Sequence, residues 1–116
     1  MATDEIRDAP DYGVPTDRII TGPGTVKIAD NWADLMDGSI DQTLAGAGIQ
    51  IASTFWYTGS NDDGSIKATT CSGWTDGSTF FDGTYGRTIY TTSGWLSTGE
   101  ATCGATNYEI LCLAWR

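Results

Sequence analysis

Carboxylates are the most numerous side chains in this sequence that are able to do chemistry. The 116 residues include 15 Asp and Glu, six Lys and Arg and no His, which gives a formal net charge of −9. Two carboxylates with different pKa values are able to hydrolyse a glycosidic bond, one as the acid and the other as nucleophile or base. With so many acids some pair is always available, and no spacing singles one out. We therefore predict a protein that is not an enzyme.

The lack of histidine removes several other classes of site. Histidine is the commonest general base near neutral pH, the usual activator of a Ser or Cys nucleophile and the commonest zinc ligand. Triad hydrolases and ordinary zinc sites are therefore not expected. The negative charge repels phosphate backbones and anionic headgroups, so we expect neither nucleic acid nor a membrane as partner.

Two groups of acids offer oxygen atoms of the kind that Ca²⁺ prefers. They are Asp30, Asp34, Asp37 and Asp41 in one group, and Asp62 and Asp63 in the other. Their spacing is not that of an EF-hand loop, and helix capping, turns and a solvated surface account for the same residues. We predict no metal ion and no other cofactor.

Short strands, one short helix and long loops must position these side chains. Apolar residues alternate with polar ones around 19–20 and 26–28, on either side of a Gly-Pro-Gly turn, and this pattern predicts two short strands. Asp30 or Asn31 is placed to cap a short helix that has Trp32, Leu35 and Met36 on one face and ends near Gly38.

Further strands are expected later in the chain. Ile49, Ile51 and residues 55–57 indicate a strand, and residues 61–64 (Asn-Asp-Asp-Gly) indicate a turn. Residues 64–100 are rich in Gly, Ser and Thr but carry many aromatic rings, which is typical of ordered loops held against a core. Residues 108–115 have apolar side chains in both alternating sets and predict a terminal strand buried on both faces. The fold class is therefore α+β and mostly β.

The first 17 residues have a different character. They hold five acids, two of the three prolines and no periodicity, so we expect an extended acidic N-terminal arm over 1–17 and a domain over 18–116. A disordered terminus and an ordered arm packed on a neighbouring subunit both fit this pattern. If the arm assembles, Tyr12, Val14 and Pro15 are its candidate contact residues.

Several motifs occur in an order that resembles a known family. They are GTVKIADNWADLMDGSI at 24–40, WYTGSNDDG at 56–64, CSGWT at 71–75, Gly-Trp at 94–95, Cys103, and Ile-Leu-Cys at 110–112. Over 16–116 the chain is similar to the C-terminal part of bacterial extracellular domains related to collagen endostatin. The resemblance implies a compact C-type-lectin-like fold with short strands, one short helix and a long loop region. The family's helical N-terminal half is not present in this sequence.

The resemblance also implies how the three cysteines pair. It assigns a disulfide to Cys71 and Cys103 and leaves Cys112, whose usual partner lies in the helical half, free or paired outside this chain. Without His, Cys112 in an apolar strand is expected to be a buried, inert thiol. A sheet without its usual cover predicts self-association or a partner chain.

The resemblance to this fold does not imply calcium-dependent sugar binding. The Glu-Pro-Asn, Gln-Pro-Asp and Trp-Asn-Asp motifs of sugar-binding C-type lectins are absent, and residues 95–97 are Trp-Leu-Ser. The 72–100 loop has the Gly, Ser, Thr and Tyr content of an adaptable binding surface. Its candidate contact residues are Phe81, Asp82, Tyr85, Tyr90 and Trp95, although in this kind of fold the tryptophans mostly pack beneath the loops.

Two functions fit these features. The first is a non-enzymatic recognition or adhesion module on an extracellular or particle surface, with a protein or glycan ligand that the sequence does not identify. The alternative is a structural virion protein, such as a capsid or tail decoration protein, which assembles through its arm and its sheet surface. The sequence contains no signal peptide, which suits assembly in the cytoplasm.

Overall fold

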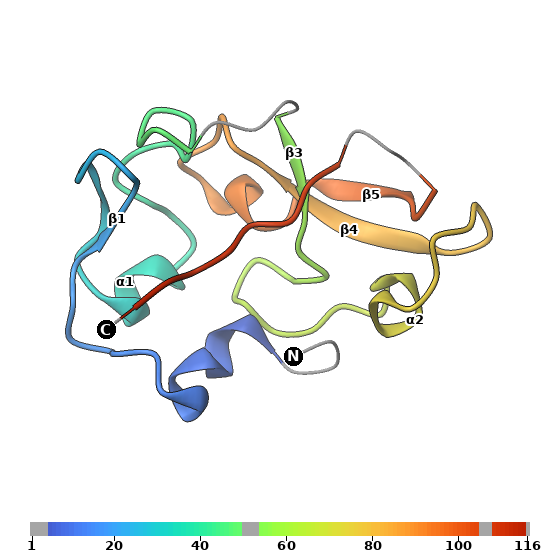
Figure 1. The fold of residues 1–116 in the computed structure, drawn as a ribbon, viewed down its shortest axis with the longest axis horizontal. Helices are drawn as coiled ribbons and strands as arrows, with labels where there is room; N and C mark the ends of the chain where they lie inside the picture. Colours follow the sequence, from blue (N-terminus) through green and yellow to red (C-terminus); the bar gives the residue numbers. More distant parts are fainter. Residues whose placement is uncertain (1–4, 50–53, 105–107, 116) are drawn as a thin grey trace.

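The structure is a computed structural model that describes residues 5–49, 54–104 and 108–115 (Figure 1). It has an α+β architecture dominated by short strands, turns and loops, which confirms the predicted fold class. In chain order its elements are the 3-10 helix η1 (Ile6–Tyr12), β1 (Ile20–Thr21), β2 (Lys27–Ala29), α1 (Trp32–Leu35), β3 (Phe55–Tyr57), α2 (Cys71–Trp74), β4 (Asp82–Arg87), the 3-10 helix η2 (Ser93–Trp95) and β5 (Gly99–Thr102). The strands form two antiparallel sheets, β1-β2 and β3-β4-β5.

Helix α1 follows the local sequence signals closely. The Asn31 side chain accepts a hydrogen bond from the Asp34 N–H at 3.0 Å and so caps the first turn. Trp32 and Leu35 are buried, and Met36 packs against the same core. The predicted capped helix and its apolar face are confirmed.

The core lies between the β1-β2 hairpin, α1, η2 and the inner face of β3. Trp56 stacks on Trp95 with ring centroids 6.0 Å apart, and its indole N–H donates to the Trp95 carbonyl at 2.9 Å. A Cβ on Gly86 would lie 1.9 Å from that same carbonyl oxygen, so glycine allows β4 to lie directly against η2. The buried members of this core are Ala9, Val14, Ile28, Ala29, Trp32, Leu35, Ile40, Leu44, Ala47, Trp56, Trp95 and Leu96.

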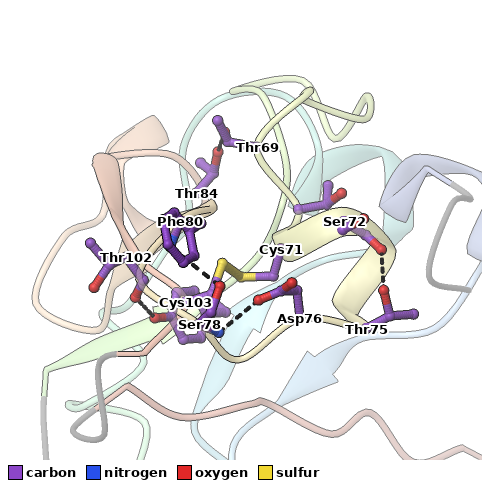
Figure 2. Close-up of a disulfide and its surroundings, with 12 residues drawn as sticks. Thr69, Cys71, Ser72, Thr75, Asp76, Ser78, Phe80, Thr84, Thr102 and Cys103 are labelled. Atoms are coloured by element: carbon purple, nitrogen blue, oxygen red, sulfur yellow. Dashed lines mark hydrogen bonds between the residues drawn. A yellow bond between two sulfur atoms is a disulfide. The ribbon is translucent and has the colours of Figure 1, made fainter.

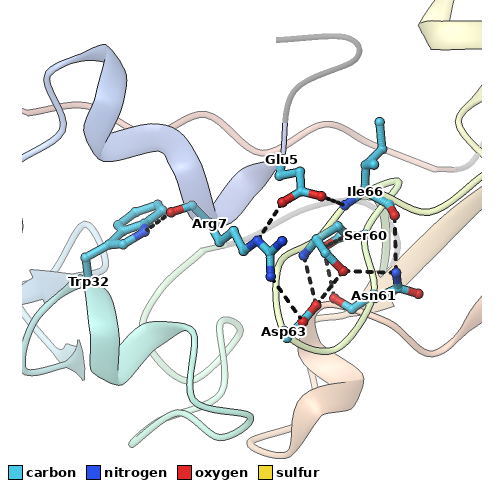
Figure 3. A network of polar contacts seen from close by, with 8 residues as sticks. Glu5, Arg7, Trp32, Ser60, Asn61, Asp63 and Ile66 are labelled. Carbon is cyan, nitrogen blue, oxygen red and sulfur yellow. Dashed lines mark hydrogen bonds and ion pairs between the residues drawn. The ribbon is translucent and has the colours of Figure 1, made fainter.

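Most of the N-terminal segment that the structure describes is helical and not extended. Residues 6–12 form η1, and Ala9 and Val14 are buried in the core. The Arg7 N–H donates to the Gly64 carbonyl at 3.2 Å. The Trp32 indole donates to the Arg7 carbonyl at 3.1 Å, as Figure 3 shows. The prediction of an extended conformation was therefore wrong for these residues. Apolar residues spaced among the acids gain more from the core than from solvent.

The region predicted as a long loop contains the central strand of the larger sheet. Strand β4 pairs with β3 along 85–87 and with β5 along 82–85. Its sequence contains two glycines and an Asp, which have low β-propensity, so the local sequence does not predict a strand. Pairing on both sides determines its conformation instead.

The terminal segment 108–115 is not the buried strand that its composition predicts. Its described pairing is one parallel bridge between Glu109 and Trp56, and it then runs across the molecule towards α1 and η1 (Figure 1). Ile110 is 78% exposed, and Cys112 and Trp115 are exposed too. A strand buried on both faces needs covering layers on both sides, and the described residues provide only one. The expectation of a buried thiol at Cys112 was wrong for the same reason.

Candidate functional site

A row of stacked side chains crosses the outer face of the β3-β4-β5 sheet, the face opposite Trp56. Strand alternation directs Phe55 and Tyr57 to this face. The Tyr108 ring lies between them, with centroids 5.1 Å from Phe55 and 5.0 Å from Tyr57 and planes within 20° and 28° of parallel. Tyr85 meets Phe55 edge-on at 5.1 Å. Each of these four rings therefore contacts at least one of the others.

Two further side chains extend the stack at its ends. Trp74 lies 5.8 Å from Tyr57 at one end, and the Arg87 guanidinium lies over Phe55 at 4.8 Å at the other. We call the five side chains Arg87, Phe55, Tyr108, Tyr57 and Trp74 the aromatic row. All five are partly exposed, and Trp74 is the most open at 38%.

Glycines on the neighbouring strands make space for these rings. A Cβ on Gly83 would lie 2.9 Å from the Tyr57 ring, and one on Gly99 would lie 3.0 Å from the Tyr85 hydroxyl.

The Tyr57 hydroxyl donates to the Thr102 carbonyl at 2.7 Å. Burial raises the pKa of Tyr57, with a smaller contribution from Tyr108, and burial also raises the pKa of Tyr108.

A disulfide supports the Trp74 end of the row. Cys71 and Cys103 are bonded, as the family resemblance implied, and they join α2 to the end of β5 (Figure 2). Residues 71–74 have φ values of 51°, 55°, 70° and 65°, so α2 is a left-handed turn. Such a conformation costs about 1–2 kcal/mol per non-glycine residue. The disulfide, the Thr70 cap and the tilted contact of the Trp74 ring with Tyr57 offset this cost and fix where Trp74 points.

At the other end of the row, Arg87 has an unusual environment. Its guanidinium lies between the rings of Phe55 and Tyr90, at 4.8 and 5.5 Å. It donates to the Tyr90 hydroxyl at 3.5 Å and to the Thr54 hydroxyl at 3.3 Å, which are long contacts. Its Nε is buried and has no hydrogen-bond partner among the described residues.

The structure divides the predicted contact residues into surface and core. Tyr85 and Tyr90 adjoin the aromatic row, and Phe81 and Asp82 are exposed at the start of β4. Trp95 is only 4% exposed because its ring packs on Trp56, so its selection as a surface residue was wrong.

Several residues at this surface were not predicted from the sequence. They are Phe55, Tyr57, Arg87 and Tyr108, together with Phe80, which is 91% exposed on the loop before β4. The alternation of Phe55 and Tyr57 was a usable signal, since two rings two residues apart on a strand share a face. Nothing local indicated that Tyr108, some fifty residues later, lies between them.

The candidate assembly residues adjoin the C-terminal segment. Tyr12 and Val14 line an apolar cavity of about 380 Å³ together with Leu113 and Trp115, and we call this cavity the terminal groove. Cys112 lines it as well. A neighbouring cavity of about 250 Å³ is lined by Val14 and Pro15. The three residues therefore gather at one surface, although Val14 is itself buried.

The acidic group in and around α1 already has a cation beside it. Oxygen atoms of Asp30, Asp34 and Asp41 lie within 4.8 Å of one another. The Lys27 ammonium pairs with Asp30 at 2.7 Å and with Asp41 at 3.0 Å, and these contacts raise the pKa of Lys27. Asp34 accepts the backbone N–H of Asp30 at 2.7 Å. The ion pairs with Lys27 and the backbone hydrogen bond to Asp34 thus explain why these carboxylates lie close together.

Comparison with family models, with curated proteins and with solved structures finds no match for this chain. The endostatin-related family and the C-type-lectin-like fold therefore stay predictions from the sequence motifs. Among the residues described, no helix is long and apolar enough to cross a membrane.

Proposed function

We propose that this protein is a non-enzymatic recognition or adhesion module of the C-type-lectin-like kind, displayed on an extracellular or particle surface. Its ligand is a glycan whose sugar rings pack on the aromatic row. The observation that carries the proposal is the row itself: five side chains in contact with one another along one sheet face, each partly exposed. Rings that serve only the core are buried, as Trp56 and Trp95 are.

Rigidity makes such a surface suitable for binding. Aromatic rings offer a large contact area with few rotatable bonds, and stacking has already fixed their positions. A ligand therefore loses little free energy in ordering the surface. The disulfide and the left-handed turn hold Trp74 in the same way.

The experiment is a binding screen of the native protein on a panel of immobilised glycans, repeated with Trp74→Ala and Val26→Ala. Val26 is a matched control because it is apolar and 39% exposed, close to the 38% of Trp74, but lies outside the row. We expect Trp74→Ala to weaken retention at least tenfold, as is typical when a central aromatic contact is removed, and Val26→Ala to leave it unchanged. Retention of no glycan, or equal retention by both variants, would contradict the proposal.

A specific observation favours a second candidate, an assembly protein such as a virion decoration protein. The terminal groove is lined by apolar residues from both ends of the chain, and three of them, Tyr12, Leu113 and Trp115, are exposed. Apolar surface of this kind is normally covered in an interface.

Light scattering coupled to size exclusion, with thiol counting, tests this candidate. A discrete multimer near a multiple of 12.4 kDa with one free thiol per chain is expected, and Trp115→Ser should dissociate it while Val26→Ser does not. A monomer at all concentrations would count against assembly.

A further inference from the structure

We propose that Arg87 binds the carboxylate of an acidic sugar, a hexuronic acid residue, at one end of the aromatic row. This inference rests on the proposed glycan-binding function and adds the chemical class of the ligand. It is carried by a half-buried arginine that has aromatic neighbours and hydroxyl contacts but no acidic partner among the residues that the structure describes.

The missing acidic partner is notable in so acidic a chain. Arg7 pairs with Glu5 and Asp63, Lys27 pairs with Asp30 and Asp41, and Lys67 pairs with Glu100. Among the residues that the structure describes, Arg87 makes no such ion pair; its polar contacts are two hydroxyl groups. A partly desolvated charge without a counter-charge is unfavourable, and an incoming carboxylate would relieve this.

The surroundings of Arg87 also suit a carboxylate geometrically. Phe55 and Tyr90 hold the guanidinium between their rings, which orients its donors in advance. A carboxylate accepts two parallel hydrogen bonds from this fork, which are shorter and stronger than the long contacts to Thr54 and Tyr90. The two hydroxyls remain beside the ligand as partners for sugar hydroxyls.

A sugar fits this position better than an acidic peptide does. Arg87 is the last residue of β4, the central strand, and it pairs with Phe55 of β3. A peptide would need an open strand edge for its backbone hydrogen bonds. Next to Arg87, β4 pairs with β3 on one side, and Gly86 lies directly against the Trp95 carbonyl on the other. A sugar needs one ring face and a few hydroxyls, and the rings from Phe55 to Trp74 continue the surface for the next sugars.

The net charge of −9 gives the interaction a distinctive dependence on salt. Distant carboxylates repel an acidic sugar, and salt screens this long-range repulsion more than it screens a contact at a partly buried site. The affinity of Arg87 for the acidic sugar should therefore stay the same or increase as the salt concentration rises to about 0.15 M. Adventitious binding of an anion to surface cations weakens under the same change.

The experiment uses two ligands that differ in one group. The native protein is titrated with methyl β-D-glucuronide and, in parallel, with methyl β-D-glucoside, in which CH₂OH replaces the carboxylate. Nuclear magnetic resonance follows the Nε–H signal of Arg87, assigned by its loss in Arg87→Lys, and the indole signal of Trp74. We expect the glucuronide to shift the Arg87 signal and to bind at least tenfold more tightly than the glucoside, as a charge-assisted hydrogen bond allows.

Substitutions then test the role of the guanidinium fork. Arg87→Lys keeps the charge but loses the fork, so the preference for glucuronide should fall below about threefold. Arg7→Lys is the control, because Arg7 already has acidic partners, and it should change nothing. Tyr90→Phe keeps the ring, removes one hydroxyl contact and should weaken binding about two- to threefold.

Three results would overturn the inference. Equal binding of both glycosides, detected at Trp74 and insensitive to Arg87→Lys, would remove the carboxylate site but leave the glycan-binding function standing. An equal response of Arg87 to inorganic sulfate would show only adventitious anion binding. No binding of either glycoside at about 100 mM would also overturn it, while the glycan panel judges the proposed function separately.

Discussion

The two faces of the β3-β4-β5 sheet are built from the same three strands but differ in how they use aromatic rings. On the inner face Trp56 and Trp95 are stacked and buried, and the Trp56 indole N–H has a hydrogen-bond partner. On the outer face the rings are stacked just as closely, yet they stay in contact with solvent. The outer rings therefore stack in a defined arrangement without being buried. The hydrophobic stabilisation of this sheet comes mainly from the rings on its inner face.

The largest expected effect comes from comparing substitutions of two tryptophans, one on each face. Trp95→Ala should lower the free energy of unfolding by about 3–5 kcal/mol because it leaves a cavity beside Trp56. Trp74→Ala should lower it by only about 1 kcal/mol because its ring is 38% exposed. Urea unfolding followed by circular dichroism measures both.

If Trp95→Ala does not fold, Trp95→Phe gives a smaller cavity and keeps the comparison measurable. Equal losses for the substitutions at the two positions would mean that the outer face contributes to stability as the core does.

The disulfide gives a second test, which is directed at the outer face. Replacing Cys71 and Cys103 together by Ser opens a connection between residues 32 positions apart. The loop-closure entropy predicts a loss of about 3–4 kcal/mol. We further expect the Trp74 fluorescence to change more than the near-ultraviolet circular dichroism of the Trp56–Trp95 pair, because the left-handed turn loses its link to β5.

A loss below about 1 kcal/mol, or a core signal that changes as much as that of Trp74, would show that the disulfide does not act locally.

The smallest expected effect is a titration confined to the outer face. Burial raises the pKa of Tyr57 above its ordinary value near 10, so the folded state keeps this proton longer than the unfolded state does. The resulting stability is present below the unfolded pKa and is lost as the pH rises through the folded one. An alkaline absorbance titration should therefore show a late phenolate phase from Tyr57 and Tyr108 that becomes smaller in Tyr57→Phe.

The same late phase should vanish in urea, where all tyrosines are solvated. A late phase of undiminished size in Tyr57→Phe would contradict the contribution of Tyr57 and assign the phase to Tyr108, whose pKa burial also raises.

Local sequence signals predicted the parts of this fold that depend on a few neighbouring residues. The Asn31 cap and the face of α1, the two short strands before it, the strand over 55–57 and the Asn61 turn are of this kind. The pairing of Cys71 with Cys103 came from the resemblance of several motifs in order, not from any local pattern.

The sequence by itself determined the acidity, the missing histidine chemistry, the fold class and the short elements whose capping and alternation are local. Tertiary structure alone decided that β4 is a strand and that η1 packs on Trp32. It also decided that much of 108–115 is exposed to solvent, and which tryptophan side chains are exposed. The aromatic row belongs to this second group, since Tyr108 enters between Phe55 and Tyr57 from the far end of the chain. Caps and alternation act over a few residues, whereas pairing, stacking and burial depend on partners that only folding brings together.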